Sequence, residues 1–196
     1  MKIASFLFFI VLLAMGCQQQ EVKRKRYFDL DSLVSAQVVY LSKSKASLKK
    51  DATISGRSSS SVNTLDSTAW SHELDVFRQL DLINRPIYSD VYNTKDGVKD
   101  SKSNLLIRSY EAPANSAVPY LRLFYQTTPA RLKKLEALYQ ETNSLYNSQR
   151  KLEMYFDDTT GKPCLIGFLV EGHQKMILSD SVHYTIQAEI QPANIP

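Results

Sequence analysis

The 196-residue chain contains three histidines and two cysteines, the residue types best suited to metal binding and nucleophilic catalysis. His72 is followed by Glu73, as in the zinc-binding helix of many proteases. That motif needs a second histidine four residues after the first, and this position is Val76. We therefore interpret His72 as a surface position of a helix.

His173 and His183 flank a short predicted strand at residues 174–178, and a regular hairpin would bring them close together. Zinc sites in proteins use three or four protein ligands, and no cysteine or carboxylate cluster lies near these two histidines in the sequence. The sequence therefore predicts no metal and no cofactor, with both histidines in exposed turns or strands.

The remaining nucleophiles give no catalytic pattern. Cys164 lies in an apolar segment, which predicts a buried and unreactive thiol, and Lys162 is the one cation close to it in sequence. The sequence has no Gly-x-Ser-x-Gly segment, no phosphate-binding glycine loop and no histidine with an evident acidic partner. Asp157 and Asp158 lie in a predicted turn, where aspartate is common because of its local hydrogen bonds. We predict a non-enzymatic protein and assign no catalytic residues.

The N-terminus predicts export. A basic residue precedes a short apolar run at residues 6–14, as in a secretory signal, and the run is shorter than the roughly 20 residues that span a bilayer. Residues 14–17 (Ala-Met-Gly-Cys) resemble the lipobox of Gram-negative lipoproteins in Gly16 and Cys17, although Leu13 stands one place early and Met15 is bulkier than usual. An ordinary cleaved signal and an uncleaved anchor are the alternatives.

The lipobox resemblance implies cleavage before Cys17, acylation of its sulfur and stable anchoring by two or more chains. Gln18 follows where some inner-membrane lipoproteins have aspartate, so the resemblance implies the outer membrane, with the protein facing the periplasm. Residues 17–27 form the anchor and a basic tether. The tether contains four cations, Lys23, Arg24, Lys25 and Arg26. They either contact anionic headgroups or belong to a solvated linker. The net charge of +4 gives no reason to expect nucleic-acid binding.

Residues 28–196 predict a single α+β domain. Apolar residues recur every three or four positions from Leu30 to Leu41, with Asp29 or Asp31 as N-cap, which predicts a helix over residues 30–45. Asp66 as N-cap predicts a second helix over residues 67–82, ending before Pro86. A strand and then a polar strand or loop occupy residues 46–63 between them.

After residue 86 the pattern predicts an antiparallel meander. Strands are expected at residues 87–92, 104–110, 120–126, 145–156, 164–170, 174–178 and 184–190. Turns are expected at residues 96–97, 157–161 and 171–172. Residues 129–141 allow two interpretations. Thr128, Pro129 and the leucine spacing favour a helix, whereas a strand would give residues 145–156 an adjacent partner, and we favour the strand.

Six tyrosines lie in predicted strands, where tyrosine suits both a half-buried sheet face and a binding surface: Tyr120, Tyr125, Tyr139, Tyr146, Tyr155 and Tyr184. The expected fold is a curved antiparallel sheet of about six to eight strands with the two N-terminal helices packed on one face. This element order resembles the half-barrel of the LolA/LolB carriers.

The leading functional hypothesis is a lipid-anchored envelope protein that acts by binding an envelope protein or lipid, as an accessory of an outer-membrane assembly. The alternatives are a LolA/LolB-like carrier or receptor for lipid or lipoprotein, and an envelope hydrolase. A carrier requires an apolar cavity between sheet and helices, and a hydrolase requires a serine, a histidine and a carboxylate in one cleft.

Overall fold

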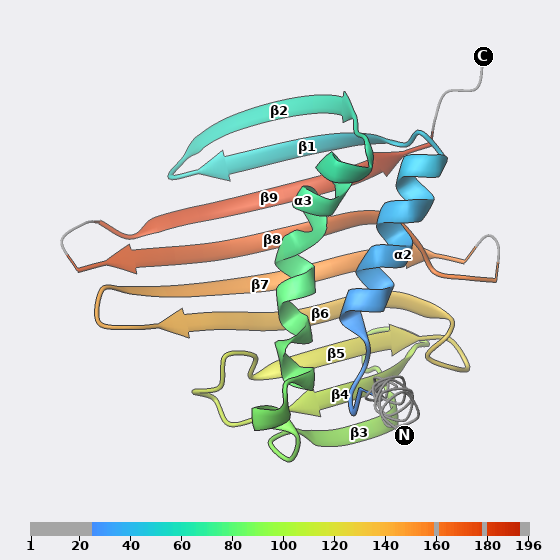
Figure 1. Cartoon of the computed structure of the whole chain (residues 1–196), viewed down its shortest axis with the longest axis vertical. Coiled ribbons are helices and arrows are strands. Elements are labelled where there is room, and N and C mark those ends of the chain that lie inside the picture. The colour runs from blue at the N-terminus through green and yellow to red at the C-terminus, as the bar shows by residue number, and fades with distance from the viewer. Residues whose placement is uncertain (1–24, 159–160, 178–179, 193–196) are drawn as a thin grey trace, which may run out of the picture.

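The computed structural model describes residues 25–158, 161–177 and 180–192, so Cys17, Lys23 and Arg24 lie outside the described residues. Within these ranges the chain forms two α-helices and one open, nine-stranded antiparallel sheet with strand order β2-β1-β9-β8-β7-β6-β5-β4-β3 (Figure 1). The expected α+β class, with two N-terminal helices on one face, is confirmed. The helical elements are α2 (Leu30–Lys43), α3 (Ser67–Arg78), η1 (Gln79–Asn84) and η2 (Pro86–Tyr88). The strands are β1 (Ser47–Ile54), β2 (Arg57–Thr64), β3 (Asn93–Lys99), β4 (Leu106–Glu111), β5 (Tyr120–Tyr125), β6 (Leu132–Thr142), β7 (Tyr146–Asp157), β8 (Cys164–Met176) and β9 (Val182–Gln191).

Both helices begin where the sequence predicts and for the predicted reason. The Asp29 carboxylate accepts the Ser32 amide hydrogen at 2.9 Å, and the Asp66 carboxylate accepts the Ala69 amide hydrogen at 2.8 Å. Each bond satisfies a backbone donor that has no partner within its own helix. The second predicted helix ends at Arg78 and continues as the tighter turns of η1.

Most of the ambiguous segment 129–141 forms the strand β6 (Leu132–Thr142), as we favoured, whereas residues 129–131 belong to the turn before it. β6 pairs with β5 on one side and with β7 on the other, where the register runs without a break from Lys134↔Tyr155 to Thr142↔Asn147. Residues 134–138 pair with both neighbours and most of the rest of β6 pairs with one, and this pairing outweighs the helix propensity of its lysine, leucine and glutamate residues.

The expected strand at residues 87–92 is wrong. Residues Pro86–Tyr88 form the turn η2, and the strand at this edge is β3, which includes the predicted turn at residues 96–97 as an irregular stretch. Tyr92 is drawn into the core instead: its hydroxyl donates to the Val118 carbonyl at 2.9 Å, and its ring packs edge-on against Tyr27. Tertiary packing of tyrosine therefore overrides the local strand pattern.

The expected turn at residues 171–172 is also wrong. β8 continues through Glu171 and Gly172 to Met176, because β7 and β9 pair with it on both sides. The segments expected at 164–170 and 174–178 are thus one strand. β1, β2 and β6 are all complete strands, so within the described residues the sheet has nine strands, where about six to eight were expected.

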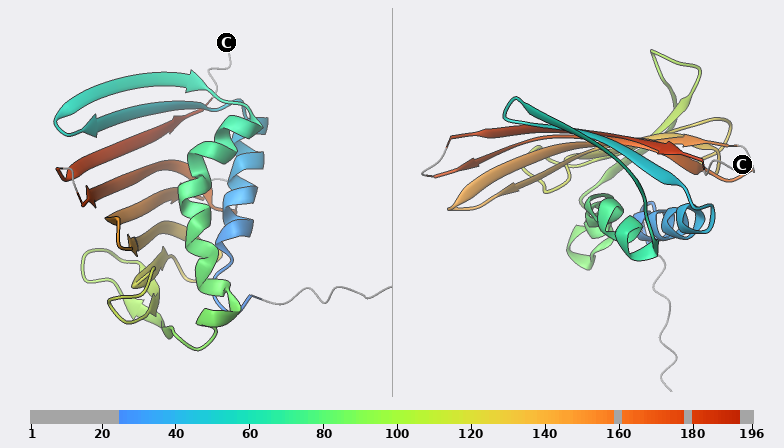
Figure 2. Two further views of the ribbon diagram at one scale, coloured as in Figure 1. Left: turned by 60° about the vertical axis from the view of Figure 1, so that its left-hand side comes forward. Right: turned by 90° about the horizontal axis from the view of Figure 1, so that it is seen from above.

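The core lies between the sheet and the two helices, which cross the strands on one side (Figure 2). Trp70 and Phe77 of α3 are fully buried, and the Phe77 ring meets Phe168 of β8 edge-on with centroids 5.5 Å apart. The Gln37 amide of α2 donates to the Pro163 carbonyl and accepts the Leu165 amide hydrogen, at 2.9 and 2.8 Å. These bonds tie α2 to the beginning of β8.

Candidate functional site: the open face of the sheet

The two helices lie on one face of the sheet, and the other face, here called the open face, points away from them (Figure 2). Side chains of a strand alternate between faces. In β7 the buried Leu152 and Met154 point into the core, so Lys151, Glu153 and Tyr155 lie on the open face. The same alternation gives the open face a charged and aromatic surface across β4 to β9.

Glu153 is the centre of an ionic network on this face. Its side-chain carboxylate accepts a bond from the Lys151 ammonium at 2.7 Å, lies 3.0 Å from the Lys134 ammonium, and accepts the Tyr155 hydroxyl hydrogen. These neighbours leave Glu153 only 4% exposed although it is on the face without helices. Burial opposes its ionisation, but the three hydrogen bonds outweigh that effect and lower the pKa of Glu153 to about 2.

The network extends sideways through charged and aromatic neighbours. Lys134 lies 3.0 Å from Glu136, and its ammonium is 5.5 Å from the centre of the Phe124 ring. Arg122 lies 3.7 Å from Glu136 and stacks over Tyr120, with 4.5 Å between guanidinium carbon and ring centre. Cation–π contacts and shared ion pairs hold these long side chains in place. The result is a prearranged polar and aromatic surface.

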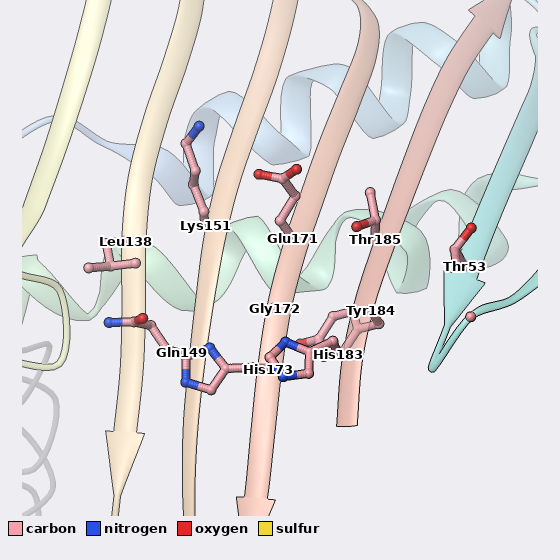
Figure 3. A pocket seen from close by; sticks show the side chains of 11 residues that line it. Thr53, Leu138, Gln149, Lys151, Glu171, Gly172, His173, His183, Tyr184 and Thr185 are labelled. Atoms are coloured by element: carbon pink, nitrogen blue, oxygen red, sulfur yellow. The ribbon is translucent and has the colours of Figure 1, made fainter. Parts of the chain in front are cut away.

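A hollow of about 370 Å³ lies beside this network, over β6 to β9 and the end of β1 (Figure 3). Its floor consists of two rows set by the strand register. One row contains Lys151, Glu171, Thr185 and Thr53, and the other contains Gln149, His173 and His183. The hollow therefore combines an ammonium, a carboxylate, two hydroxyls, an amide and two imidazoles, a set that suits recognition of a polar group.

The two histidines lie side by side, as expected for a regular hairpin. His173 and His183 are paired residues of β8 and β9, with ring centres 5.8 Å apart. Among the described residues, however, no group of three or more metal-ligating side chains occurs. His183 Nε2 lies 3.5 Å from the Ser181 hydroxyl oxygen, a distance at the limit of a hydrogen bond. His72 belongs to α3, on the other side of the sheet.

A second hollow, of about 610 Å³ and mainly apolar, opens where the C-terminal end of α2 meets the ends of β8 and β9. Leu41, Leu165, Ile166 and Ile190 provide its apolar walls. Cys164 also lines it and is buried at 6% exposure, as the sequence predicts. Ile166 is left outside the regular pairing at a register shift between β7 and β8, and it is 48% exposed at the rim.

The described part of the basic tether contacts the domain. Lys25 forms ion pairs with Asp29 at 2.6 Å and with Asp81 at 2.8 Å, and Arg26 lies 2.8 Å from Asp90. Tyr27, placed at the end of the tether by sequence, is buried in the core. These two cations therefore already have acidic partners near the beginning of α2.

The six strand tyrosines are divided between the two faces. Tyr120 and Tyr155 lie on the open face, and the strand register places Tyr139, Tyr146 and Tyr184 on the opposite one. Tyr125 lies at a register shift, is buried, and donates its hydroxyl hydrogen to Asp96 at 2.6 Å. No sequence motif predicted the ionic network. The usable signal was the alternation of charged residues at 134 and 136 and at 151 and 153, which places all four on one face if both segments are strands.

Comparison with models of protein families, with curated proteins and with solved structures finds no match. The lipobox and the LolA/LolB resemblance therefore stay predictions. Within the described ranges no helix is both long and apolar enough to cross a bilayer.

Proposed function

We propose that this chain is a non-enzymatic, lipid-anchored protein of the bacterial cell envelope that binds an envelope partner on the open face of its sheet. The observation that carries the proposal is the prearranged open face. One side of the sheet is used for the core, whereas the other holds the Glu153 network and the polar hollow beside it. Rigid polar groups and aromatic rings lose little entropy on binding, which suits them to a protein interface.

The anchor has its own test. Replacing Cys17 with serine removes the sulfur that would carry the acyl chains, so we expect the variant to move from the membrane fraction to the soluble fraction. Acyl labelling followed by fractionation measures both properties. A variant that stays membrane-bound without label would show that Cys17 is not the anchor.

The binding face is tested by site-specific photocrosslinking in cells. A photoreactive residue at Thr185 or Gln187, two exposed open-face positions, should capture an envelope protein. The matched controls are His72 and Asp75, which are exposed on α3. Equal capture from both sets, or capture from the α3 positions alone, would contradict the assignment of the open face.

A carrier of lipid or lipoprotein is the second candidate, and the apolar hollow at the end of α2 favours it. Its volume of about 610 Å³ lies within the range of ordinary ligand pockets, although the large side chains at the centre of the core are fully buried. A carrier should retain lipid that organic extraction and mass spectrometry detect, and Ile166→Arg at the rim should reduce the amount. Purified protein without extractable lipid would count against this candidate.

A further inference from the structure

The outer edge of β2 carries backbone groups that the rest of the described chain does not pair. β2 is the first strand of the sheet order and pairs with β1 over eight consecutive residues, from Ser47↔Thr64 to Ile54↔Arg57. Seven of its eight residues are exposed, Ser61 being the partly covered one. A long, regular and accessible edge is a template for another strand.

The hairpin turn identifies which residues direct their backbone outward. Ser55 and Gly56 have positive φ values of 47° and 80°, as in a two-residue type I′ turn, so Ile54 and Arg57 form a hydrogen-bonded pair. Antiparallel pairs alternate between bonded and non-bonded. The backbone N–H and C=O groups that point away from β1 therefore belong to the even-numbered residues: Ser58, Ser60, Val62 and Thr64.

The opposite edge of the sheet is protected, and β2 is not. β3 contains a register shift between Lys95 and Val98, a glycine at φ 72° and two lysines, the usual devices that prevent edge-to-edge pairing. β2 has no proline and no register shift, and Arg57 is its one charged residue. The difference makes β2 the edge that is suited to pairing.

We propose that β2 pairs antiparallel with β2 of a second copy of this chain, so that two sheets become one. The charge of the edge favours a copy in this orientation, because the two Arg57 side chains then lie at opposite ends of the new ladder and face neutral residues. The side chains are also self-complementary. Hydroxyls of this hairpin already bond across strands, Ser47 with Thr64 at 2.9 Å and Thr53 with Ser58 at 2.8 Å. In an antiparallel copy, serines 58–61 face a second strand of the same composition.

The direction of the outward backbone groups restricts the register in which the two copies of β2 can pair. Even-numbered residues must pair with even-numbered residues, and paired residues point to the same side of a sheet. Two registers near the centre meet this condition, with Ser60 or with Ser61 opposite its own counterpart. In both, the helices of the two copies lie on one side and the two open faces join into one continuous surface.

Sedimentation equilibrium of the full chain in density-matched detergent tests the proposal. We expect a concentration-dependent dimer. Ser60→Pro removes the outward N–H without removing a bond to β1, and because the loss occurs in both copies, the dimer dissociation constant should rise at least about 10-fold. Ser60→Ala keeps the N–H and should change the constant by less than about threefold.

Lys99→Pro is the matched control on the opposite edge. The Asp100 amide donates to the Leu105 carbonyl at 2.9 Å, so by the same alternation the Lys99 N–H points away from β4.

If circular dichroism shows that Ser60→Pro does not fold, Ser60→Lys replaces it, because a lysine on the edge should also weaken the dimer. Three results would overturn the proposal: a chain that is monomeric at every concentration, a dimer unaffected by the Ser60 variants, and a dimer weakened equally by Lys99→Pro.

Discussion

Removal of the Glu153 charge should destabilise the protein in a way that depends on pH. Glu153→Gln keeps the size of the side chain but leaves the ammonium groups of Lys134 and Lys151 beside a neutral amide. A carboxyl whose pKa falls from 4.5 to about 2 on folding contributes up to about 3 kcal/mol at neutral pH. Glu153 itself is buried, but Lys134 and Lys151 are partly exposed, and solvent screens their charges, so we expect a loss of about 1–2 kcal/mol in the free energy of unfolding.

The sign of the pH dependence follows from the lowered pKa. The unfolded chain binds the proton more tightly than the folded chain, so the stabilisation is complete above about pH 4.5 and is lost as the pH falls towards 2. The difference in unfolding free energy between the native chain and Glu153→Gln should therefore be largest at neutral pH and shrink between pH 4.5 and 2.

Urea unfolding followed by circular dichroism at pH 7, 4 and 3 measures this difference. Glu189→Gln is the matched control, since Glu189 lies on the same face, is exposed, and is 3.7 Å from Lys49. The Glu189→Gln substitution should lower the free energy of unfolding by about 0.5 kcal/mol or less. Equal losses for the two variants at pH 7, or a loss for Glu153→Gln that stays constant with pH, would refute the reasoning.

Two further predictions concern the packing of the sheet. A Cβ at Gly167 would lie 2.7 Å from the Ala188 backbone oxygen, whereas a Cβ at Gly172 would meet the movable end of a tyrosine ring, so Gly167→Ala should lower the thermal midpoint more than Gly172→Ala. The reverse order would show that the backbone of β9 gives way more easily than the ring. Gln37→Leu removes the partner of the Leu165 N–H and of the Pro163 carbonyl. We therefore expect the free energy of unfolding, measured by chemical denaturation, to fall by about 2–4 kcal/mol. A loss below about 0.5 kcal/mol would mean that solvent replaces the amide.

The helices could be predicted because their signals are local. Asp29 and Asp66 cap the turns that follow them, and the apolar spacing of each helix selects one buried face. The buried state of Cys164 was predictable from its apolar neighbours for the same reason. Interactions within a few residues leave a readable pattern in the sequence.

The strands were less predictable, because pairing partners far along the chain decide them. Glu171 and Gly172 have the composition of a turn, and only the ladders with β7 and β9 make them part of a strand. Residues 87–92 alternate like a strand, yet the burial of Tyr92 against Tyr27 makes them a turn region.

The sequence by itself predicted an export signal. It also determined the caps of both helices and the alternation of charged residues in β6 and β7. Only the tertiary structure decided that Lys134 of β6 reaches Glu153 of β7, and that β2 rather than β3 has an unprotected edge. The physical reason is that strand register brings together residues distant in sequence, and register depends on every ladder of the sheet at once.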